Sequence, residues 1–298
     1  MKILITGRDG QVGFELCSAL ASLGEVIALG RSEFDLASTD MIRDVVRAIS
    51  PDVIVNAGAY TAVDRAEGEP NLAFAINGVA PGVLGAEAQR TGALVIHYST
   101  DYVFDGTGAG SYAETDAANP QNVYGQSKLA GEEALKTSGA RSVILRTSWV
   151  FGAHGSNFIK TMLRLAGERE TLRIISDQFG APTSAGLIAE VSARIISEMA
   201  PNTSDQRIGL YHLAASGLTN WYEYACHVIE AARRAGLPIK VQPDAIAAIG
   251  ADEYPTPAKR PGNSSLDTSK LRSAFGLDLP HWTRGVDQVL GNILKVHQ

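Results

Sequence analysis

Residues 2–13 read KILITGRDGQVG, and this stretch decides the fold. A compact β-rich run is followed at once by a turn with three glycines, and an amphipathic stretch over residues 14–23 comes next. Strand, glycine turn and helix in this order are typical of a dinucleotide-binding unit. In such a unit Gly7 permits a tight turn, Gly10 lets the backbone approach a pyrophosphate, and Gly13 allows helix and strand to pack closely. The helix N-terminus would offer free N–H groups to the phosphates. The alternative, a glycine turn without a ligand, is disfavoured by its place directly after the first strand.

The second expected strand, residues 26–29, bears on the choice of dinucleotide. It ends in Gly30 and Arg31. A site that prefers NAD commonly has an acidic residue here, bonded to the ribose 2′-hydroxyl. No carboxylate stands at Gly30, and Arg31 could instead contact a 2′-phosphate. We therefore favour NADPH over NADH, with Arg31 as a solvated loop charge left as the alternative.

Strands and helices alternate through the first half of the chain. Apolar β-rich runs recur at residues 53–56, 94–99 and 143–147, and helical patterns lie between them at residues 39–49 and 123–136. This alternation predicts an α/β fold with a Rossmann-like, doubly wound parallel sheet. The ligand crevice of such a sheet lies outside the carboxyl ends of its strands. The segments that fall at this edge are residues 7–13, residues 57–61, Thr100 and Trp149.

Beyond residue 149 the alternation weakens, which predicts a smaller, mixed α/β domain that binds the substrate. We expect the dinucleotide-binding domain to comprise residues 1–149 with re-entrant segments at about 174–204 and 255–277. The substrate domain would comprise about 150–173, 205–254 and 278–298. Residues 254–261, YPTPAKRP, cannot be regular structure because three prolines interrupt them. The paired cations of this loop fit a phosphate clamp, and a plain linker fits equally well.

Tyr124 and Lys128 stand one helical turn apart. A tyrosine hydroxyl is a poor proton donor or acceptor near neutral pH, because its ordinary pKa is about 10. A lysine at i+4 lies on the same helix face and is expected to lower that pKa towards the working range. Thr100, at the end of a strand, could hold a substrate carbonyl beside the phenol. A surface Tyr/Lys pair has the same spacing, so the catalytic interpretation depends on the cofactor site elsewhere in the chain.

Composition excludes several classes of function. The 298 residues are 45% hydrophobic and 19% charged, as in a soluble globular protein with a sizeable core. No apolar stretch approaches the ~18 residues that span a bilayer. The chain begins directly in a strand and has two cysteines, so we expect a cytoplasmic protein without a membrane partner or a disulfide framework. The net charge of −6 argues against a nucleic-acid partner, whereas a small anionic substrate needs only a few local arginines.

Several strings together resemble the extended short-chain dehydrogenase/reductases, and among them the dTDP-4-dehydrorhamnose reductase family. The resemblance runs from the first strand to the last helix, and its later strings are more specific than the glycine turn. The strings are GRDGQVG at 7–13, DVIVN at 52–56, TAVD at 61–64, STDYVF at 99–104, NVYG at 122–125 with Lys128, RTSW at 146–149, DQFGAPT at 177–183, and the loop at 254–261.

This resemblance implies reduction of the 4-keto group of dTDP-4-dehydro-L-rhamnose by NADPH or NADH, giving dTDP-L-rhamnose. Tyr124 would protonate the developing alkoxide, and Lys128 would also bond the nicotinamide ribose. Thr100 would orient the carbonyl, while Asp101 and Trp149 would hold the sugar. Arg260 is expected to contact the nucleotide of the substrate. The implied cofactor contacts are Gly10, Gln11, Val12, Gly30, Asp35, Leu36, Ala59, Tyr60, Thr61 and Tyr98.

Two positions differ from related patterns. Nucleotide-sugar dehydratases place Asp-Glu after the threonine, but here Asp101 is followed by Tyr102, which counts against dehydration. Some members of the family share a magnesium ion at a dimer interface through three acidic positions. Glu15 and Glu190 match two of these positions, whereas Gly186 replaces the third carboxylate. A bound Mg²⁺ is therefore doubtful, and a homodimer remains an open alternative.

Two other functions fit the same residues. One is a reductase of another nucleotide-linked keto-sugar, because sugar stereochemistry depends on fine contacts. The other is a non-catalytic NAD(P)-binding regulatory subunit, since the regulatory partners of methionine adenosyltransferase resemble this family. Fold alone does not settle function. The intact set of Thr100, Tyr124 and Lys128 beside a complete glycine turn favours turnover.

Overall fold

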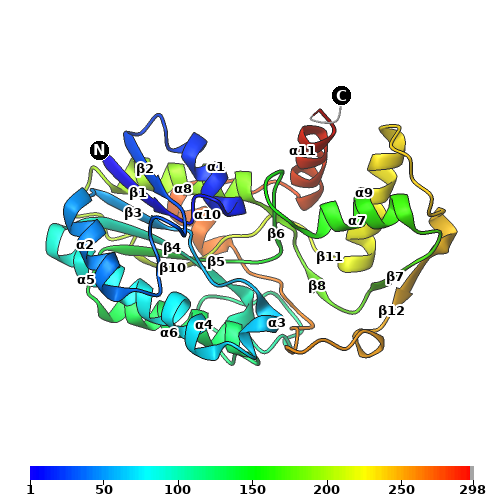
Figure 1. Cartoon of the computed structure of the whole chain (residues 1–298), viewed down its shortest axis with the longest axis horizontal. Helices are drawn as coiled ribbons and strands as arrows, with labels where there is room; N and C mark the ends of the chain where they lie inside the picture. The colour runs from blue at the N-terminus through cyan, green and yellow to red at the C-terminus, as the bar shows by residue number, and fades with distance from the viewer. Residues whose placement is uncertain (296–298) are drawn as a thin grey trace.

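A computed structural model describes residues 1–295 of the chain and places a large parallel sheet in its first part (Figure 1). The strand order is β10-β5-β4-β3-β1-β2, and every pair in this sheet is parallel. The six strands are β1 (Lys2–Thr6), β2 (Glu25–Leu29), β3 (Val53–Asn56), β4 (Leu94–Thr100), β5 (Ser142–Thr147) and β10 (Gly209–His212). The predicted Rossmann-like sheet is confirmed. The chain crosses over between β1 and β3, and their carboxyl ends form the switch point where ligands bind in such sheets.

Helices cover both faces of this sheet (Figure 1). Ile3 and Ile5 face one core, and Leu4 between them faces the other, because successive side chains of a strand point to opposite faces. Burial on both faces explains why the strands are continuous apolar runs rather than alternating ones. The first core is closed by α1 (Gln11–Ala19) and α8 (Ala185–Met199), and the second by α2 (Thr39–Ile49), α5 (Ala80–Thr91) and α6 (Val123–Thr137).

A π-helical turn, η1 (Ala75–Val79), joins α4 (Pro70–Phe74) to α5 and holds a loop that follows β3. Asn77 of this turn accepts a hydrogen bond from the Tyr60 amide at 2.8 Å and donates to the Tyr60 carbonyl at 2.9 Å. It also donates to Ser127 of α6 at 3.0 Å. The turn therefore fixes the loop after β3 against the helix that carries Tyr124. Two short elements flank this region: α3 (Val63–Ala66) and the 3₁₀ turn η2 (Asp101–Val103).

A second part of the molecule, built from α7 (Phe158–Glu168), α9 (Trp221–Arg234), α11 (Trp282–Lys295) and short strands, lies on the far side from α2 and α5, whereas α8 packs on α1 over the large sheet (Figure 1). Its helices α7, α9 and α11 pack together beside short strand pairs. Its other elements are the pair β7 (Leu172–Ile175) and β12 (Ile246–Ile249), the pair β8 (Phe179–Gly180) and β11 (Thr219–Asn220), and the turns η3 (Pro243–Ala245) and η4 (Ala251–Glu253). The pair β6 (Val150–Phe151) and β9 (Thr183–Ser184) lies between the parts. None of the helices within residues 1–295 is long and apolar enough to cross a membrane.

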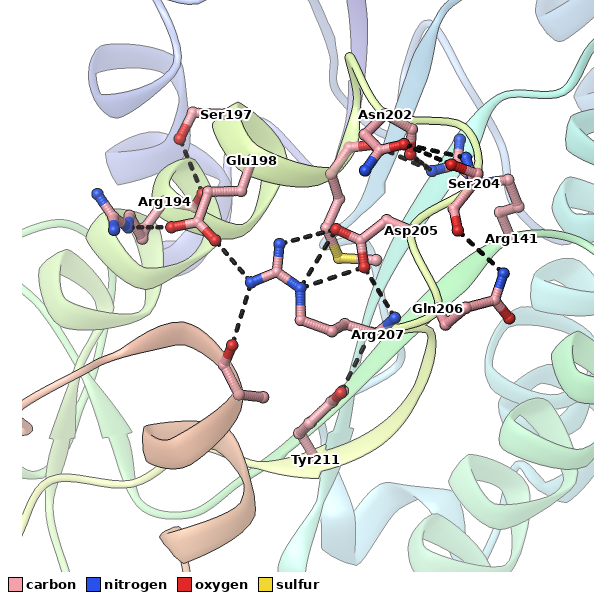
Figure 2. A network of polar contacts seen from close by, with 12 residues as sticks. Arg141, Arg194, Ser197, Glu198, Asn202, Ser204, Asp205, Gln206, Arg207 and Tyr211 are labelled. Carbon is pink, nitrogen blue, oxygen red and sulfur yellow. Dashed lines mark hydrogen bonds and ion pairs between the residues drawn. The ribbon is translucent and has the colours of Figure 1, made fainter.

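The expectation that residues 205–254 all belong to the smaller domain is wrong for β10, which pairs with β5 as the edge of the large sheet. Figure 2 shows the polar network that holds this edge. Arg207 donates to Asp205 and to Glu198 of α8, each at 2.7 Å, and to the carbonyl of Ala274 at 3.1 Å. Ala274 belongs to α10 (Ser269–Phe275). One guanidinium thus joins α8, the loop that leads to β10, and α10.

Candidate active site

A cleft of about 890 Å³ opens at the carboxyl edge of the large sheet. Segments from most of the first part of the chain meet there, as the sequence predicted. The predicted cofactor residues that line it are Gly7, Gly10, Gln11, Val12, Arg31, Asp35, Leu36, Ala59, Tyr60, Thr61, Tyr98, Tyr124 and Lys128. The predicted substrate residues that line it are Thr100, Asp101 and Trp149. Gly13 and Gly30 are not among the described residues that line it.

The glycine turn is shaped for a ligand that approaches its backbone. Gly7 has a φ of 72°, and a Cβ there would lie 2.6 Å from the backbone of Gly58. A Cβ at Gly13 would lie 2.1 Å from the carbonyl oxygen of Gly7, so α1 can approach β1 only without a side chain. Among the described residues no side chain caps α1 at Gly10, and the first turn of α1 carries no acidic residue. A helix end of this kind presents N–H groups to an anion, so this part of the cleft fits a pyrophosphate.

A buried polar chain fixes the ends of β1 and β3 beneath this turn. Thr6 Oγ1 accepts from the amide of Gly58 at 2.9 Å and donates to Asn56 Oδ1 at 2.7 Å. Asn56 Nδ2 in turn contacts His97 Nδ1 at 3.0 Å. Burial, aided by the charge of Lys128, holds the pKa of His97 well below its usual range. His97 is therefore neutral and serves the packing of this edge.

A cluster of charged residues lies at the end of β2, and only Arg31 among them was predicted from the sequence. Arg31 lines the cleft, and its charge lowers the pKa of Glu69 alongside the larger effects of Tyr60 and Arg65. Arg8 was missed: it forms an ion pair with Glu33 at 2.8 Å, and Glu33 accepts from the amide of Gly30 at 3.0 Å. Charged residues flanking a glycine turn were the available signal.

Tyr124 is a half-buried phenol in the cleft wall whose pKa is raised to about 12, mainly by desolvation. A hydrogen bond with Thr100 lowers this pKa, and the charge of Asp101 raises it. The prediction that Lys128 lowers the pKa of Tyr124 is wrong for this structure. The ammonium of Lys128 donates to the carbonyl of Tyr98 at 2.6 Å, and burial lowers its own pKa to about 8. The i+4 spacing puts both side chains on one face, but the charge of Lys128 is not among the causes that shift the pKa of Tyr124, and desolvation raises that pKa.

Asp101 presents a buried carboxyl to the cleft. Its Oδ1 accepts from Thr100 Oγ1 at 3.1 Å, and burial raises its pKa to about 6, against the hydrogen bonds with Ser264 and Thr100. In the part of the chain that the structure describes, Asp101 Oδ2 and Thr147 Oγ1 are buried without a hydrogen-bond partner, and both residues line the cleft. Buried polar atoms without partners are costly, which makes these two atoms candidates for hydrogen bonds to a ligand. Thr147 was not predicted, although it ends β5, the strand that Trp149 follows.

A buried ion pair lies behind Lys128 on the same face of α6. Both carboxylate oxygens of Glu132 accept from Arg146 of β5, at 2.8 and 2.7 Å, and Ser99 donates to Glu132 at 2.5 Å. Arg146 also lies over the ring of Phe104, 4.9 Å from its centroid. The charge of Glu132 raises the pKa of Lys128 and so opposes the effect of burial. This pair was not predicted from the sequence, although a carboxylate four residues after Lys128 on the same helix was a signal for it.

The two remaining predicted substrate residues, Trp149 and Arg260, line different cavities. Trp149 follows β5 with a φ of 49°, and its indole stacks on that of Trp221 with centroids 3.8 Å apart. Arg260 is not brought to the main cleft. It donates to Asp64 at 2.7 Å and lines a separate cavity of about 260 Å³ together with Lys259.

The possible metal positions lie away from this cleft. Glu15 is on α1, and Glu190 and Gly186 are on α8, which packs against α1. Over residues 1–295, no group of three or more His, Cys, Asp or Glu side chains is gathered as a metal site would require.

A doubly wound sheet with a glycine turn at its switch point, and a Tyr–Lys pair beside a strand-end threonine, defines the class of extended short-chain dehydrogenase/reductases. The family model described as RmlD substrate binding domain matches residues 1–294. The chain belongs to this family, the dTDP-4-dehydrorhamnose reductases, which are oxidoreductases.

Individual relatives agree with this assignment. The dTDP-4-dehydrorhamnose reductase of Escherichia coli is 50% identical over 302 residues, covering 98% of each chain. The crystal structure of a dTDP-4-dehydrorhamnose reductase from Clostridium acetobutylicum has a TM-score of 0.91 at 33% identity, covering 99% of this chain and 100% of that one. The enzyme of the same name from Bacillus anthracis, solved in complex with NADP, has a TM-score of 0.87 at 32% identity, covering 98% and 99%.

Proposed function

We propose that this chain reduces the 4-keto group of dTDP-4-dehydro-L-rhamnose with NADPH or NADH, giving dTDP-L-rhamnose. The observation that carries the proposal is one cleft with an uncapped helix end and glycine turn at one end, and Thr100, Tyr124 and Lys128 at the other. The names of the relatives support this substrate, and the Bacillus anthracis structure with NADP supports the cofactor. Arg31 at the end of β2 favours NADPH.

The raised pKa of Tyr124 suits the direction of this reaction. At about 12 it keeps the phenol protonated at neutral pH, so the hydroxyl is ready to donate. When bound, the reduced dinucleotide supplies the hydride. Thr100 and Tyr124 hold the keto oxygen, and the alkoxide that develops there is a stronger base than a phenolate. The proton therefore moves from Tyr124 Oη to the sugar O4, and solvent then reprotonates the phenolate.

Lys128 and Asp101 would hold the cofactor and the sugar in place for this proton transfer. With a pKa of about 8, Lys128 is mostly charged at pH 7, and we propose that it donates to the nicotinamide ribose. The unpaired Oδ2 of Asp101 and the hydroxyl of Thr147 would bind sugar hydroxyls, while the indole of Trp149 packs against the ring. Arg260 would contact the nucleotide from the smaller cavity.

A coupled assay tests this proposal. The purified protein is incubated with NADPH and the 4-keto sugar nucleotide, generated in situ, and the absorbance of the reduced cofactor is followed. We expect NADPH to be consumed and the product to be dTDP-L-rhamnose by mass and NMR. A product with another sugar configuration would assign the chain to a different keto-sugar. No consumption of NADPH would favour the non-catalytic binding subunit.

A further inference from the structure

An aromatic contact outside the cleft holds one of the residues that line it. Trp149 lines the cleft, and its ring lies on that of Trp221 with centroids 3.8 Å apart and planes 16° apart. Trp221 is the first residue of α9, in the second part of the chain, and does not itself line the cleft. Phe158 of α7 supports Trp221 from a distance of 4.7 Å between centroids. The contact therefore joins the strand end of the large sheet to two helices of the other part.

The backbone of Trp149 explains why its ring needs such support. A φ of 49° lies in the left-handed region, which a residue with a large side chain rarely adopts. A conformation of this kind persists only where the surroundings enforce it, and it is found mostly at functional sites. Trp149 is half-buried, so the interior of the protein does not enclose it completely. The stack on Trp221 supplies the missing constraint.

Gly180 provides the second constraint on the same ring. A Cβ at Gly180 would lie 2.8 Å from Cε2 and 3.0 Å from Cζ2 of Trp149, so only glycine leaves room for the indole. Gly180 pairs with Thr219 in the β8–β11 ladder. Thr219 comes directly before Asn220 and Trp221 in the chain. Asn220 caps α9 by accepting from the amide of Glu223 at 2.8 Å. One hydrogen-bonded unit therefore supplies both Gly180 and Trp221.

We propose that Trp221 is a positioning residue: together with Gly180 it fixes the indole of Trp149 in the cleft wall and thereby sets the affinity for the sugar of the substrate. This inference rests on the proposed function, because it assigns the sugar to the wall that Trp149 forms. Trp221 does not line the cleft, whereas the glycine turn does, so we expect its removal to act on sugar binding through Trp149 and to leave cofactor binding unchanged.

The experiment compares Trp221→Leu, Trp221→Phe and Gly180→Ala with the wild type. Trp282→Phe is the matched control, because Trp282 is a tryptophan of the same aromatic cluster that does not line the cleft. We expect Trp221→Leu to raise KM for the sugar nucleotide about tenfold, with kcat within about twofold and Kd for NADPH unchanged. Trp221→Phe keeps a ring that can stack and should recover most of this loss. Gly180→Ala should raise the same KM although Trp221 is intact.

Circular dichroism gives a readout that does not depend on activity. Stacked indoles produce an exciton couplet, which we expect in the wild type and in Trp282→Phe, and which Trp221→Phe should abolish. A couplet that survives Trp221→Phe would overturn the inference. So would a Trp221→Leu variant that melts at a lower temperature but keeps a normal KM for the sugar nucleotide, since that is a purely structural role. A wild type that shows the couplet but no turnover of the 4-keto sugar would instead overturn the proposed function.

Discussion

Replacing Lys128 by Met is expected to make the free protein more stable and, at the same time, inactive. Lys128 is buried, and its ammonium has the Tyr98 carbonyl as its hydrogen-bond acceptor at 2.6 Å. Burial lowers its pKa from 10.5 to about 8, although the charge of Glu132 opposes this. Methionine has a similar length and no charge, so it removes the buried cation with little change in volume.

The size and pH dependence of the gain in the free energy of unfolding follow from these pKa values. A pKa lowered from 10.5 to about 8 corresponds to a cost of roughly 3 kcal/mol for the charged form in the folded state. Because the folded pKa lies below the unfolded one, this cost is complete below pH 8 and disappears as the pH rises through 10.5. In Lys128→Met the Tyr98 carbonyl loses its hydrogen-bond donor, which offsets about 1 kcal/mol of the gain in stability. We expect a net gain of about 2 kcal/mol at pH 7 and near equality at pH 10.

Urea denaturation at both pH values measures this difference. The control is Lys136→Met on the same helix, where the lysine is 39% exposed and pairs with Glu133. It should change stability by less than ~0.5 kcal/mol and leave turnover normal. Lys128→Met should lose at least ~10²-fold in kcat and bind NADPH more weakly. A Lys128→Met protein that is less stable than wild type at pH 7, or whose stability difference does not vary with pH, would refute the electrostatic reasoning.

Three further substitutions test other parts of the site. Arg31→Ala should reduce the preference for NADPH over NADH, measured as the ratio of the two KM values; an unchanged ratio would exclude a role for Arg31 in that choice. Arg260→Ala should raise KM for the sugar nucleotide more than it lowers kcat, and equal damage to both would contradict a binding role. Gly13→Ala should cost about 1–3 kcal/mol of stability and weaken NADPH binding, because its Cβ would lie 2.1 Å from the Gly7 oxygen. Gly186→Ala, with nothing within 4 Å of its Cβ, is the control and should fold and bind NADPH normally.

The sheet and the gathering of the site could be predicted from the sequence because both depend on local patterns. Strands buried on both faces are continuous apolar runs, and a parallel sheet brings their carboxyl ends to one edge. The residues after β1, β3, β4 and β5 therefore meet in the cleft as expected. The cap of α2 was also predictable, since Ser38 accepts from the amide of Met41.

The remaining features depend on packing between distant segments, which no local pattern encodes. A short strand such as β10 fits either part of the chain, and the Arg207 network across α8 and α10 accompanies its place in the large sheet. The pKa of Tyr124 depends on how completely other elements bury it, so the i+4 lysine alone gave the wrong direction. The position of Arg260 depends on its pairing with Asp64, nearly two hundred residues earlier in the chain.

Turnover by Tyr124→Phe tests the central claim most directly, since this change removes only the phenolic hydroxyl from the cleft wall. Tyr211→Phe is the control, because Tyr211 is a buried tyrosine of β10 whose hydroxyl donates to the Arg207 carbonyl, outside the residues that line the cleft. NADPH consumption with the 4-keto sugar nucleotide and NADPH affinity by fluorescence are measured for both. We predict a loss of at least ~10²-fold in kcat for Tyr124→Phe, with nearly unchanged NADPH affinity, and normal values for Tyr211→Phe. Near-normal turnover by Tyr124→Phe would contradict the assignment of this phenol as the proton donor.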